Sequence, residues 1–167
     1  KALRASGVDV TLAPVADVAS VPGAALAGRA FSTDFSSAAE AMAESVKGWR
    51  KGRVAPTAKH FPGLGGATTN TDFGSATIER SAQQIRDEDL VPFKAAIGAG
   101  VPLVMAGHAL YPALDGERIA SQSQPIIQGL LREELGFDGV VITDSTEAKA
   151  VQEITDVQEA ALRNIRA

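Results

Sequence analysis

The chain contains no cysteine, which excludes disulfide bridges, thiolate metal sites and cysteine nucleophiles. It has no apolar run that approaches the roughly 18 residues needed to span a bilayer. It also has no excess of basic residues, because 16 Lys and Arg stand against 20 Asp and Glu and give a formal net charge of -4. That balance argues against nucleic acid as a partner, since phosphate binding needs clustered cations.

What is present is ordinary for a globular domain. The 167 residues are 45% hydrophobic and 22% charged, values at which disorder is not expected. This length suits one domain with a substantial core. The first seven residues predict the last turns of a helix that stops at Gly7. A helix tail without a beginning leads us to expect a piece of a longer protein, whose targeting signals can lie upstream.

Apolar, β-branched segments alternate with helical segments along the chain. Strands are predicted at Val8–Val15, Val54–Lys59, Pro102–Ala106 and Gly139–Thr143. Helices are predicted from the capping box Ser37–Glu40 to about Lys51, from the capping box Ser81–Gln84 to Gly98 with a break near Pro92, from the N-cap Ser123 to Gly136, and over 147–167.

This alternation predicts an α/β fold with a parallel sheet and helices outside it. Two architectures fit the order of elements: an open doubly wound sheet, or part of a (β/α)8 TIM-type barrel. A complete barrel typically needs about 250 residues. The four β/α units of this chain would therefore make about half of one.

Titratable residues follow all four predicted strands. Parallel α/β proteins place their active sites at the carboxyl ends of the strands, so this coincidence predicts a site at that edge. The Gly-rich loop 63–74 does not match a phosphate-binding pattern, and two His residues far apart do not indicate a metal site. The strand-end residues are Asp17, Lys59, His60, His108 and Asp144.

Four of these residues also have a structural interpretation. Asp17 is equally suited to cap the turn after its strand, and Asp144 to cap the following helix. His108 is a candidate for a buried imidazole whose hydrogen bonds are satisfied within the protein. Lys59 is a candidate for a rim charge that reaches water. The residue types alone leave these alternatives open.

At Lys59-His60-Phe61-Pro62-Gly63 the sequence resembles glycoside hydrolase family three. Within that family it is most similar to the β-N-acetylhexosaminidases that process cell-wall muropeptides and related sugars. Further segments agree in order along nearly the whole chain. They are Ala13–Val18, Gly28–Ser32, Asp89–Phe93, Val104–His108 and, the longest and most specific, Leu131–Asp144.

The resemblance implies a retaining glycosidase that cleaves a terminal β-linked N-acetylhexosamine and uses no metal or other cofactor. Such an enzyme needs one carboxylate to attack the anomeric carbon and one acid to protonate the leaving oxygen. Asp144 takes the place of the nucleophile. The residues implied in binding the sugar are Arg29, Lys59 and His60, with Asp17 and His108 as further candidates.

The sequence departs from the family at the loop that normally supplies the acid/base. The family pattern there is Asp-x-His, whereas this chain has Asn70-Thr71-Asp72. One interpretation makes Asp72 a carboxylic acid/base, which must be held protonated in order to donate. A second makes it a turn residue only. In that case the hydrolytic step is lost, and the chain is a non-catalytic sugar-binding member of the fold.

The second departure from the family is that this chain contains only part of the barrel. The family's barrel begins with two more strands and ends with at least one more than residues 1–167 contain, so we expect a single partial barrel domain. Unpaired strand edges lead us to expect that the isolated chain self-associates or is poorly ordered at its termini. The partner that the resemblance implies is a carbohydrate substrate. Relatives occur in the cytoplasm and exported to the cell wall, so the compartment stays open. An open doubly wound sheet would instead indicate a small-ligand-binding protein.

Overall fold

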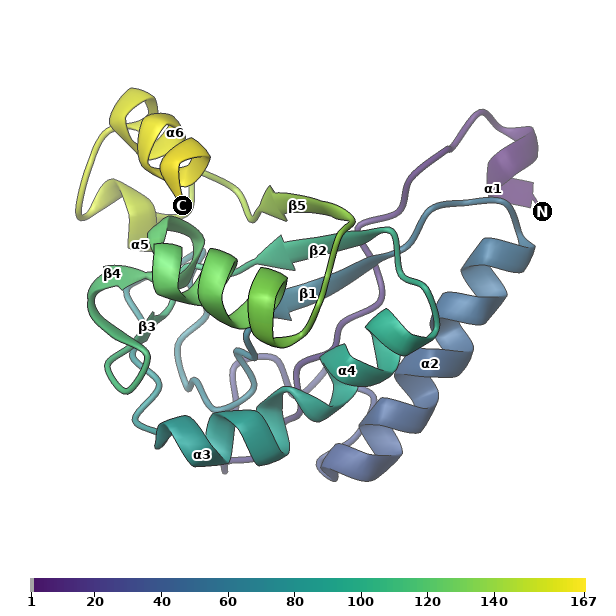
Figure 1. Ribbon diagram of the computed structural model, residues 1–167, viewed down its shortest axis with the longest axis horizontal. Helices are drawn as coiled ribbons and strands as arrows, with labels where there is room; N and C mark the ends of the chain where they lie inside the picture. Colours follow the sequence, from purple (N-terminus) through teal and green to yellow (C-terminus); the bar gives the residue numbers. More distant parts are fainter. Residues whose placement is uncertain (1) are drawn as a thin grey trace.

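The computed structural model describes residues 2–167, and its centre is a parallel sheet of three strands in the order β1-β2-β5 (Figure 1). Ala58 pairs with Val104, and Val104 pairs with Val141. Three of the four predicted strands are therefore confirmed, each with a slightly later start. Their bounds are β1 (Thr57–Phe61), β2 (Leu103–Ala106) and β5 (Val140–Thr143).

The remaining predicted strand, 8–15, lies beside β1 as an extended segment and not as a regular strand. It makes isolated parallel bridges to residues 55–59, and Ala13 O accepts a hydrogen bond of 2.8 Å from Thr57 N–H. Pro14 interrupts the ladder because it has no N–H to donate. Each extended segment therefore neighbours the next one in sequence. This order is that of a (β/α) barrel and not that of a doubly wound sheet.

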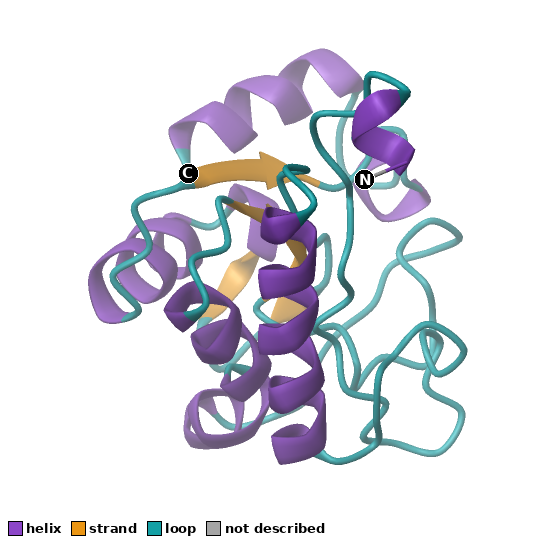
Figure 2. Ribbon diagram, turned by 90° about the vertical axis from the view of Figure 1, so that its right-hand side faces the viewer, coloured by secondary structure: helices purple, strands orange, loops and turns teal. Residues whose placement is uncertain are grey.

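The helices lie outside the sheet, with α2 and α4 side by side, and long loops occupy another side of the molecule (Figures 1 and 2). Two of the helical segments, η1 and η3, are π-helical, and η2 is a short 3-10 turn. The helical bounds are α1 (Ala2–Ala5), α2 (Phe35–Lys51), α3 (Ala82–Gln84), η1 (Ile85–Asp89), α4 (Val91–Gly98), η2 (Ala120–Gln122), η3 (Pro125–Glu134), α5 (Lys149–Gln152) and α6 (Val157–Arg166).

The start of α2 differs from the prediction. The helix begins at Phe35, and its N-cap is Asp34, whose Oδ1 accepts a hydrogen bond of 2.8 Å from Ser37 N–H. The segment Ser37–Glu40 therefore lies inside the helix and is not a capping box. Asp34 is the stronger cap because its charge also interacts favourably with the positive end of the helix dipole.

The second capping box is confirmed. Ser81 Oγ accepts a hydrogen bond of 3.1 Å from Gln84 N–H, and Ser81 N–H donates to Gln84 Oε1 at 3.0 Å. The helical region behind it is interrupted at Leu90, between η1 and α4, as the proline predicted. Pro92 then lies in the first turn of α4, where a missing N–H removes no hydrogen bond. Ser123 Oγ accepts from Ile126 N–H at 3.2 Å, as expected of a cap.

The prediction of one continuous helix over 147–167 was wrong. The segment forms two helices, α5 and α6. Asp156 caps α6, because its Oδ1 accepts a hydrogen bond of 2.8 Å from Glu159 N–H. An Asp side chain that satisfies a backbone N–H in this way favours a new helix start over a continuous helix. Between β2 and Ser123 the chain also forms a small antiparallel hairpin of β3 (Leu110–Tyr111) with β4 (Asp115–Ile119).

The core lies between the sheet and the helices. Phe61 of β1 and Phe93 of α4 are both fully buried, with their ring centroids 5.2 Å apart in an edge-to-face arrangement. The two edges of the sheet differ from this core, since Leu12 at one edge is 55% exposed and Val140 at the other is 57% exposed. Among the described residues no helix is long and apolar enough to cross a membrane.

Candidate active site

The carboxyl ends of the strands bring Asp17, His60 and Asp144 together. His60 is the bulged residue of β1, because the register with β2 shifts between Lys59 and Phe61. A bulge re-aims a side chain, and here the imidazole lies between two carboxylates. His60 Nδ1 is 2.6 Å from Asp17 Oδ2, and His60 Nε2 is 3.4 Å from Asp144 Oδ2.

Asp17 holds the loop that follows β1. Its side chain is buried and also accepts hydrogen bonds from the backbone N–H groups of His60 at 3.2 Å and Leu64 at 2.6 Å. Because an ionised carboxylate only accepts, His60 Nδ1 carries the proton shared with Asp17, and Nε2 is the nitrogen that faces Asp144. Asp17 is thus satisfied by the chain itself. This geometry supports a positioning role for Asp17 over direct contact with a sugar.

The Gly-rich loop packs tightly against its surroundings. A side chain at Gly65 would overlap the carbonyl group of Val18, and Gly63 has a φ of 128°, a region that favours glycine. Tyr111, which is buried, donates a hydrogen bond of 2.9 Å from its hydroxyl group to Gly63 O. The backbone after His60 is therefore held from several sides.

Asp89 packs against the start of the Gly-rich loop at Gly63. This role was not predicted from the sequence. A Cβ atom at Gly63 would lie 2.9 Å from Asp89 Cβ, so the two residues are in close contact. Arg80 Nε lies 2.7 Å from Asp89 Oδ2. Burial nevertheless raises the pKa of Asp89 to about 7, against the opposing effect of the Arg80 charge.

A sequence signal for Asp89 exists in the spacing of η1 and α4. Ile85, Asp89 and Phe93 follow one another at intervals of four and share one helix face. Both apolar members of this stripe are fully buried, and Asp89 is only 3% exposed. An acidic residue within an apolar helix stripe is expected to have a buried partner.

Asp144 follows β5 with both carboxylate oxygens oriented. Its Oδ1 accepts a hydrogen bond of 2.9 Å from Ser145 N–H, while Oδ2 faces His60. The backbone N–H of Asp144 donates to Ala106 O at 2.9 Å, which ties it to the end of β2. The side chain is 22% exposed and lines a cavity of about 480 Å³ together with Leu12. A held but accessible carboxylate of this kind can attack a bound carbon centre.

Lys59 is the cationic member of the site. Burial lowers the pKa of its ammonium group, and the charge of Arg29 lowers it further. The carboxylates of Asp144, Asp17 and Asp72 act in the opposite direction and raise the pKa of Lys59. Residues from three separate loops therefore act electrostatically on one lysine, although they are far apart in the sequence.

The Asp72 loop lies against the segment that follows Asp144. Ala150 N–H donates to Thr71 O at 3.1 Å, and Lys149 N–H donates to Asp72 O at 3.3 Å. The turn itself is built by Asn70, whose Oδ1 accepts a hydrogen bond of 3.0 Å from Asp72 N–H. The carboxylate of Asp72 is exposed and is not needed to form this turn. This arrangement leaves the Asp72 side chain available for chemistry.

His108 is buried and uses both of its ring nitrogens within the protein. Nδ1 is 2.8 Å from Ser121 Oγ, and Nε2 is 2.9 Å from Ser145 O. Because a carbonyl oxygen only accepts, Nε2 carries the proton and Nδ1 accepts from the serine hydroxyl. Burial lowers the pKa of His108, which favours this neutral form, and the nearby Asp144 charge opposes the shift. The geometry supports the alternative of a satisfied imidazole over contact with substrate.

Metal binding finds no support in the described residues, among which no group of three or more His, Asp and Glu side chains could hold an ion. The site instead combines an oriented carboxylate (Asp144), a histidine beside it (His60), two cations (Lys59 and Arg29) and an exposed carboxylate on a neighbouring loop (Asp72). These groups can position a polar ligand, attack it and exchange protons with it.

The sequence is similar to curated proteins that are named beta-hexosaminidase. The chain is 42% identical over 142 residues to a beta-hexosaminidase of Stenotrophomonas maltophilia, a match that covers 85% of this chain and 42% of the relative. It is 31% identical over 165 residues to a beta-hexosaminidase of Methylobacillus flagellatus, which covers 99% of this chain and 47% of the relative. The chain therefore spans less than half the length of these relatives.

Solved structures show the same fold over nearly the whole of this chain. A glycoside hydrolase family 3 beta-N-acetylglucosaminidase from Paenibacillus matches with a TM-score of 0.96 and 35% identity, over 98% of this chain and 32% of that one. A beta-N-acetylhexosaminidase from Beutenbergia cavernae matches with a TM-score of 0.89 and 36% identity, over 98% and 50%. The prediction of a partial (β/α)8 barrel is thereby confirmed. The family model of the glycosyl hydrolase family 3 N-terminal domain matches residues 1–167, and the chain belongs to that family.

Proposed function

We propose that the protein containing this domain is a glycoside hydrolase that removes terminal β-linked N-acetylhexosamine with retention of configuration. The observation that carries the proposal is Asp144, whose two oxygens are oriented by Ser145 N–H and His60 at the edge of a cavity. A retaining glycosidase needs such a rigidly held carboxylate as its nucleophile. The names of the relatives in both comparisons support the choice of sugar.

In the first step, an oxygen of Asp144 attacks the anomeric carbon of the bound sugar. The glycosidic C–O bond breaks as an acid donates its proton to the leaving oxygen, which gives a glycosyl ester on Asp144. In the second step, water attacks the anomeric carbon while the same group, now a base, accepts its proton. The ester bond breaks, and the Asp144 carboxylate is restored.

Asp72 is the residue that we assign to this acid/base role. Its loop lies on the segment after Asp144, and its carboxylate is exposed and not used by the local turn. To donate, the carboxyl group must be protonated when substrate is bound.

The remaining polar groups are assigned to sugar binding and positioning. Lys59 and Arg29 supply N–H donors for sugar hydroxyl or amide oxygens. His60 is close enough to Asp144 to orient it, and Asp17 fixes the orientation of His60. His108 supports the loop after Asp144 through Ser145 O.

The nucleophile is tested in the full-length protein with Asp144→Asn. We expect turnover of an aryl N-acetyl-β-glucosaminide to fall by at least about 10³-fold, because the attacking charge is lost. A 5-fluoro N-acetylglucosaminyl fluoride should add one sugar mass to the peptide that contains Asp144. Asp138→Asn is a matched control, since Asp138 is exposed just before β5. Absence of both turnover and adduct in the unmodified protein would refute the proposal.

The acid/base is tested separately with Asp72→Asn. If Asp72 donates the proton, the variant loses far more activity on alkyl glycosides, whose leaving group needs protonation, than on a nitrophenyl glycoside, whose leaving group does not. If Asp72 is a turn residue only, both substrates lose activity equally or not at all. The turn itself should survive, because it is made by Asn70.

A second function is favoured by one observation, the replacement of the usual loop histidine by Asp72. In this alternative the protein binds the sugar without cleaving it. Calorimetry with N-acetylglucosamine would then show binding that Asp144→Asn leaves unchanged, and the unmodified protein would show no turnover. Turnover that depends on Asp144 rules this alternative out.

We also propose that the isolated 167-residue chain self-associates. The support is the pair of sheet edges, where Leu12 and Val140 are about half exposed in the described residues. Exposed apolar strand edges pair readily with other edges. Sedimentation velocity of this chain should show dimers or larger species that dissociate on dilution. A monodisperse monomer that melts cooperatively would contradict this.

A further inference from the structure

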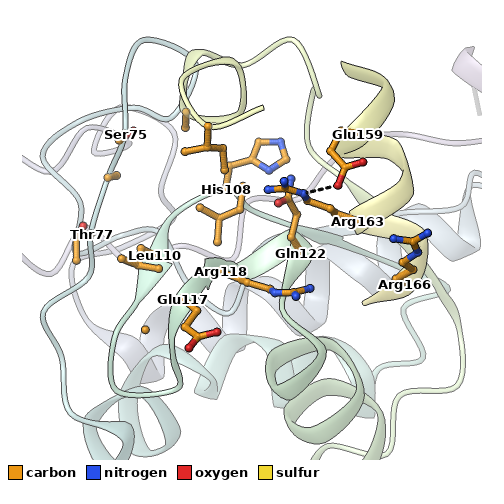
Figure 3. Close-up of a pocket in the computed structure, with 15 residues that line it drawn as sticks. Ser75, Thr77, His108, Leu110, Glu117, Arg118, Gln122, Glu159, Arg163 and Arg166 are labelled. Atoms are coloured by element: carbon orange, nitrogen blue, oxygen red, sulfur yellow. Dashed lines mark hydrogen bonds and ion pairs between the residues drawn. The ribbon is translucent and has the colours of Figure 1, made fainter. Parts of the chain in front are cut away.

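A larger cavity lies apart from Asp144, between the β3–β4 hairpin and α6 (Figure 3). Its volume is about 610 Å³, within the range of sites that hold small molecules. Among the described residues assigned above to the candidate active site, only His108 reaches it. This cavity is therefore a separate feature of the fold, for which the hydrolase reaction has no use.

Three arginines line this cavity from two different elements. Arg118 comes from β4, and Arg163 and Arg166 come from α6, as Figure 3 shows. Arg163 Nε donates to Glu159 Oε1 at 2.9 Å, which orients its guanidinium group and leaves its terminal nitrogens unused by that bond. In the described part of the chain, Arg118 and Arg166 have no carboxylate within ion-pair distance. Cations that face one cavity repel one another, and an anion between them relieves that repulsion.

A buried donor without a partner lines the same cavity. Gln122 is 2% exposed, and its Nε2 has no hydrogen-bond partner within residues 2–167. An unsatisfied buried donor is costly and calls for a specific explanation. Gln122 lies at the cavity wall near Arg118 and Arg163 (Figure 3), so this polar side chain belongs to the same wall as the cations.

We propose that this cavity is a binding site for a hexose-sized ligand that carries one oxyanion, either a phosphate monoester or a carboxylate. The guanidinium groups of Arg118, Arg163 and Arg166 would hold the oxyanion. The apolar part of the wall, with Leu110, Ile119 and Ile154, would take the body of the ligand. The proposal is independent of the hydrolase activity, since it uses neither Asp144 nor Asp72.

The charged side chains of the cavity wall also limit the net charge of the ligand. Two carboxylates, Glu117 and Glu159, line the cavity beside the three guanidinium groups. The formal excess is therefore a single positive charge, which suits one oxyanion and disfavours nucleotides and other polyanions. Glu117 can in addition accept hydrogen bonds from ligand hydroxyl groups.

The test is calorimetric titration of the full-length protein with glucose 6-phosphate, glucuronate and glucose. We expect saturable binding of glucose 6-phosphate, glucuronate or both, and none of neutral glucose. Arg118→Gln should weaken that binding about tenfold or more, since it removes a charge-assisted hydrogen bond. Lys51→Gln is the matched control, because Lys51 is an exposed residue at the end of α2 and the loss of its positive charge should change nothing.

Arg163→Gln breaks a helix ion pair and can alter α6, so Arg118→Gln on the exposed hairpin is the decisive variant. Relative binding of the phosphate and the carboxylate probe identifies the class of oxyanion. The proposal is overturned if neither charged probe binds saturably, if glucose binds equally well, or if Arg118→Gln binds like the unmodified protein. Displacement of the probe by excess N-acetylglucosamine would place it in the active site and would also overturn the proposal.

Discussion

His60 Nε2 lies 3.4 Å from Asp144 Oδ2, while the opposite nitrogen of the same ring is bound to the buried Asp17. His60 therefore connects the buried carboxylate of Asp17 to the accessible carboxylate of Asp144. Because His60 Nε2 and Asp144 Oδ2 are so close, an anomeric carbon cannot lie between them. The pair is thus suited to orient the nucleophile and not to act as nucleophile and acid on opposite sides of one bond.

The first prediction concerns this pair. His60→Ala in the full-length protein should lower kcat by about 10²–10³-fold, because Asp144 loses the group that orients it and an electrostatic contact at the site. Steady-state kinetics on an aryl N-acetyl-β-glucosaminide measures the effect. His108→Ala tests the contrast, since His108 contacts only Ser121 and the backbone of Ser145 through its ring nitrogens. Equal losses in both variants would contradict a direct orienting role for His60.

The positions of these residues could be predicted from the sequence, but their partners could not. Apolar runs followed by Asp17, His60, His108 and Asp144 locate the carboxyl edge of the sheet without any coordinates. Whether each side chain faces ligand or protein depends on contacts such as His108 with Ser121. Only the folded chain brings such groups together.

Local competition explains the errors in the helices. Ser37 and Glu40 satisfy the capping pattern, yet Asp34 is the better acceptor and starts α2 earlier. Asp156 similarly starts α6 where apolar periodicity alone predicted a continuous helix. Both cases show that a strong cap outweighs a weaker pattern nearby. Asp89 is a different case, because its place in an apolar helix stripe indicates burial but does not identify Arg80 as its partner.

The second prediction concerns Asp89 and pH. Burial raises its pKa from 3.8 to about 7 in the folded chain. The folded state therefore holds this proton more tightly than the unfolded state, and stability from Asp89 falls as pH rises between about 4 and 7. Relative to Asp89→Asn, the unmodified protein should lose roughly 2–3 kcal/mol of unfolding free energy between pH 5 and pH 7.5.

Urea denaturation at the two pH values measures this difference. Other acidic groups titrate over the same range, so the comparison is between variants and not between pH values alone. Asp87→Asn is the matched control, because Asp87 lies on the same helical segment and is exposed. A pH-independent difference between the unmodified protein and Asp89→Asn would show that Asp89 is ionised throughout.

The third prediction compares two glycines. A methyl group at Gly65 would overlap the Val18 carbonyl, whereas one at Gly48 in α2 would meet nothing within 4 Å. Gly65→Ala should therefore displace the loop after His60 and destabilise the fold by about 1–3 kcal/mol. Gly48→Ala should stabilise α2 by about 0.5–1 kcal/mol, because alanine is the better helix former. Thermal denaturation of both variants checks the opposite signs, and loss of activity is expected for Gly65→Ala alone.

The last prediction uses Lys59. Burial and the neighbouring charge of Arg29 lower the pKa of its ammonium group, so Lys59 loses its proton at lower pH than an exposed lysine does. If Lys59 binds the sugar as a cation, KM must rise on the alkaline side of the pH profile. Lys59→Met should raise KM at neutral pH and remove that alkaline dependence, whereas Lys59→Arg should keep KM low to higher pH because arginine does not lose its proton. If the alkaline rise in KM persists unchanged in Lys59→Met, the rise must come from deprotonation of another group. The pH profile therefore separates a sugar-binding lysine from one that only balances the carboxylates around it.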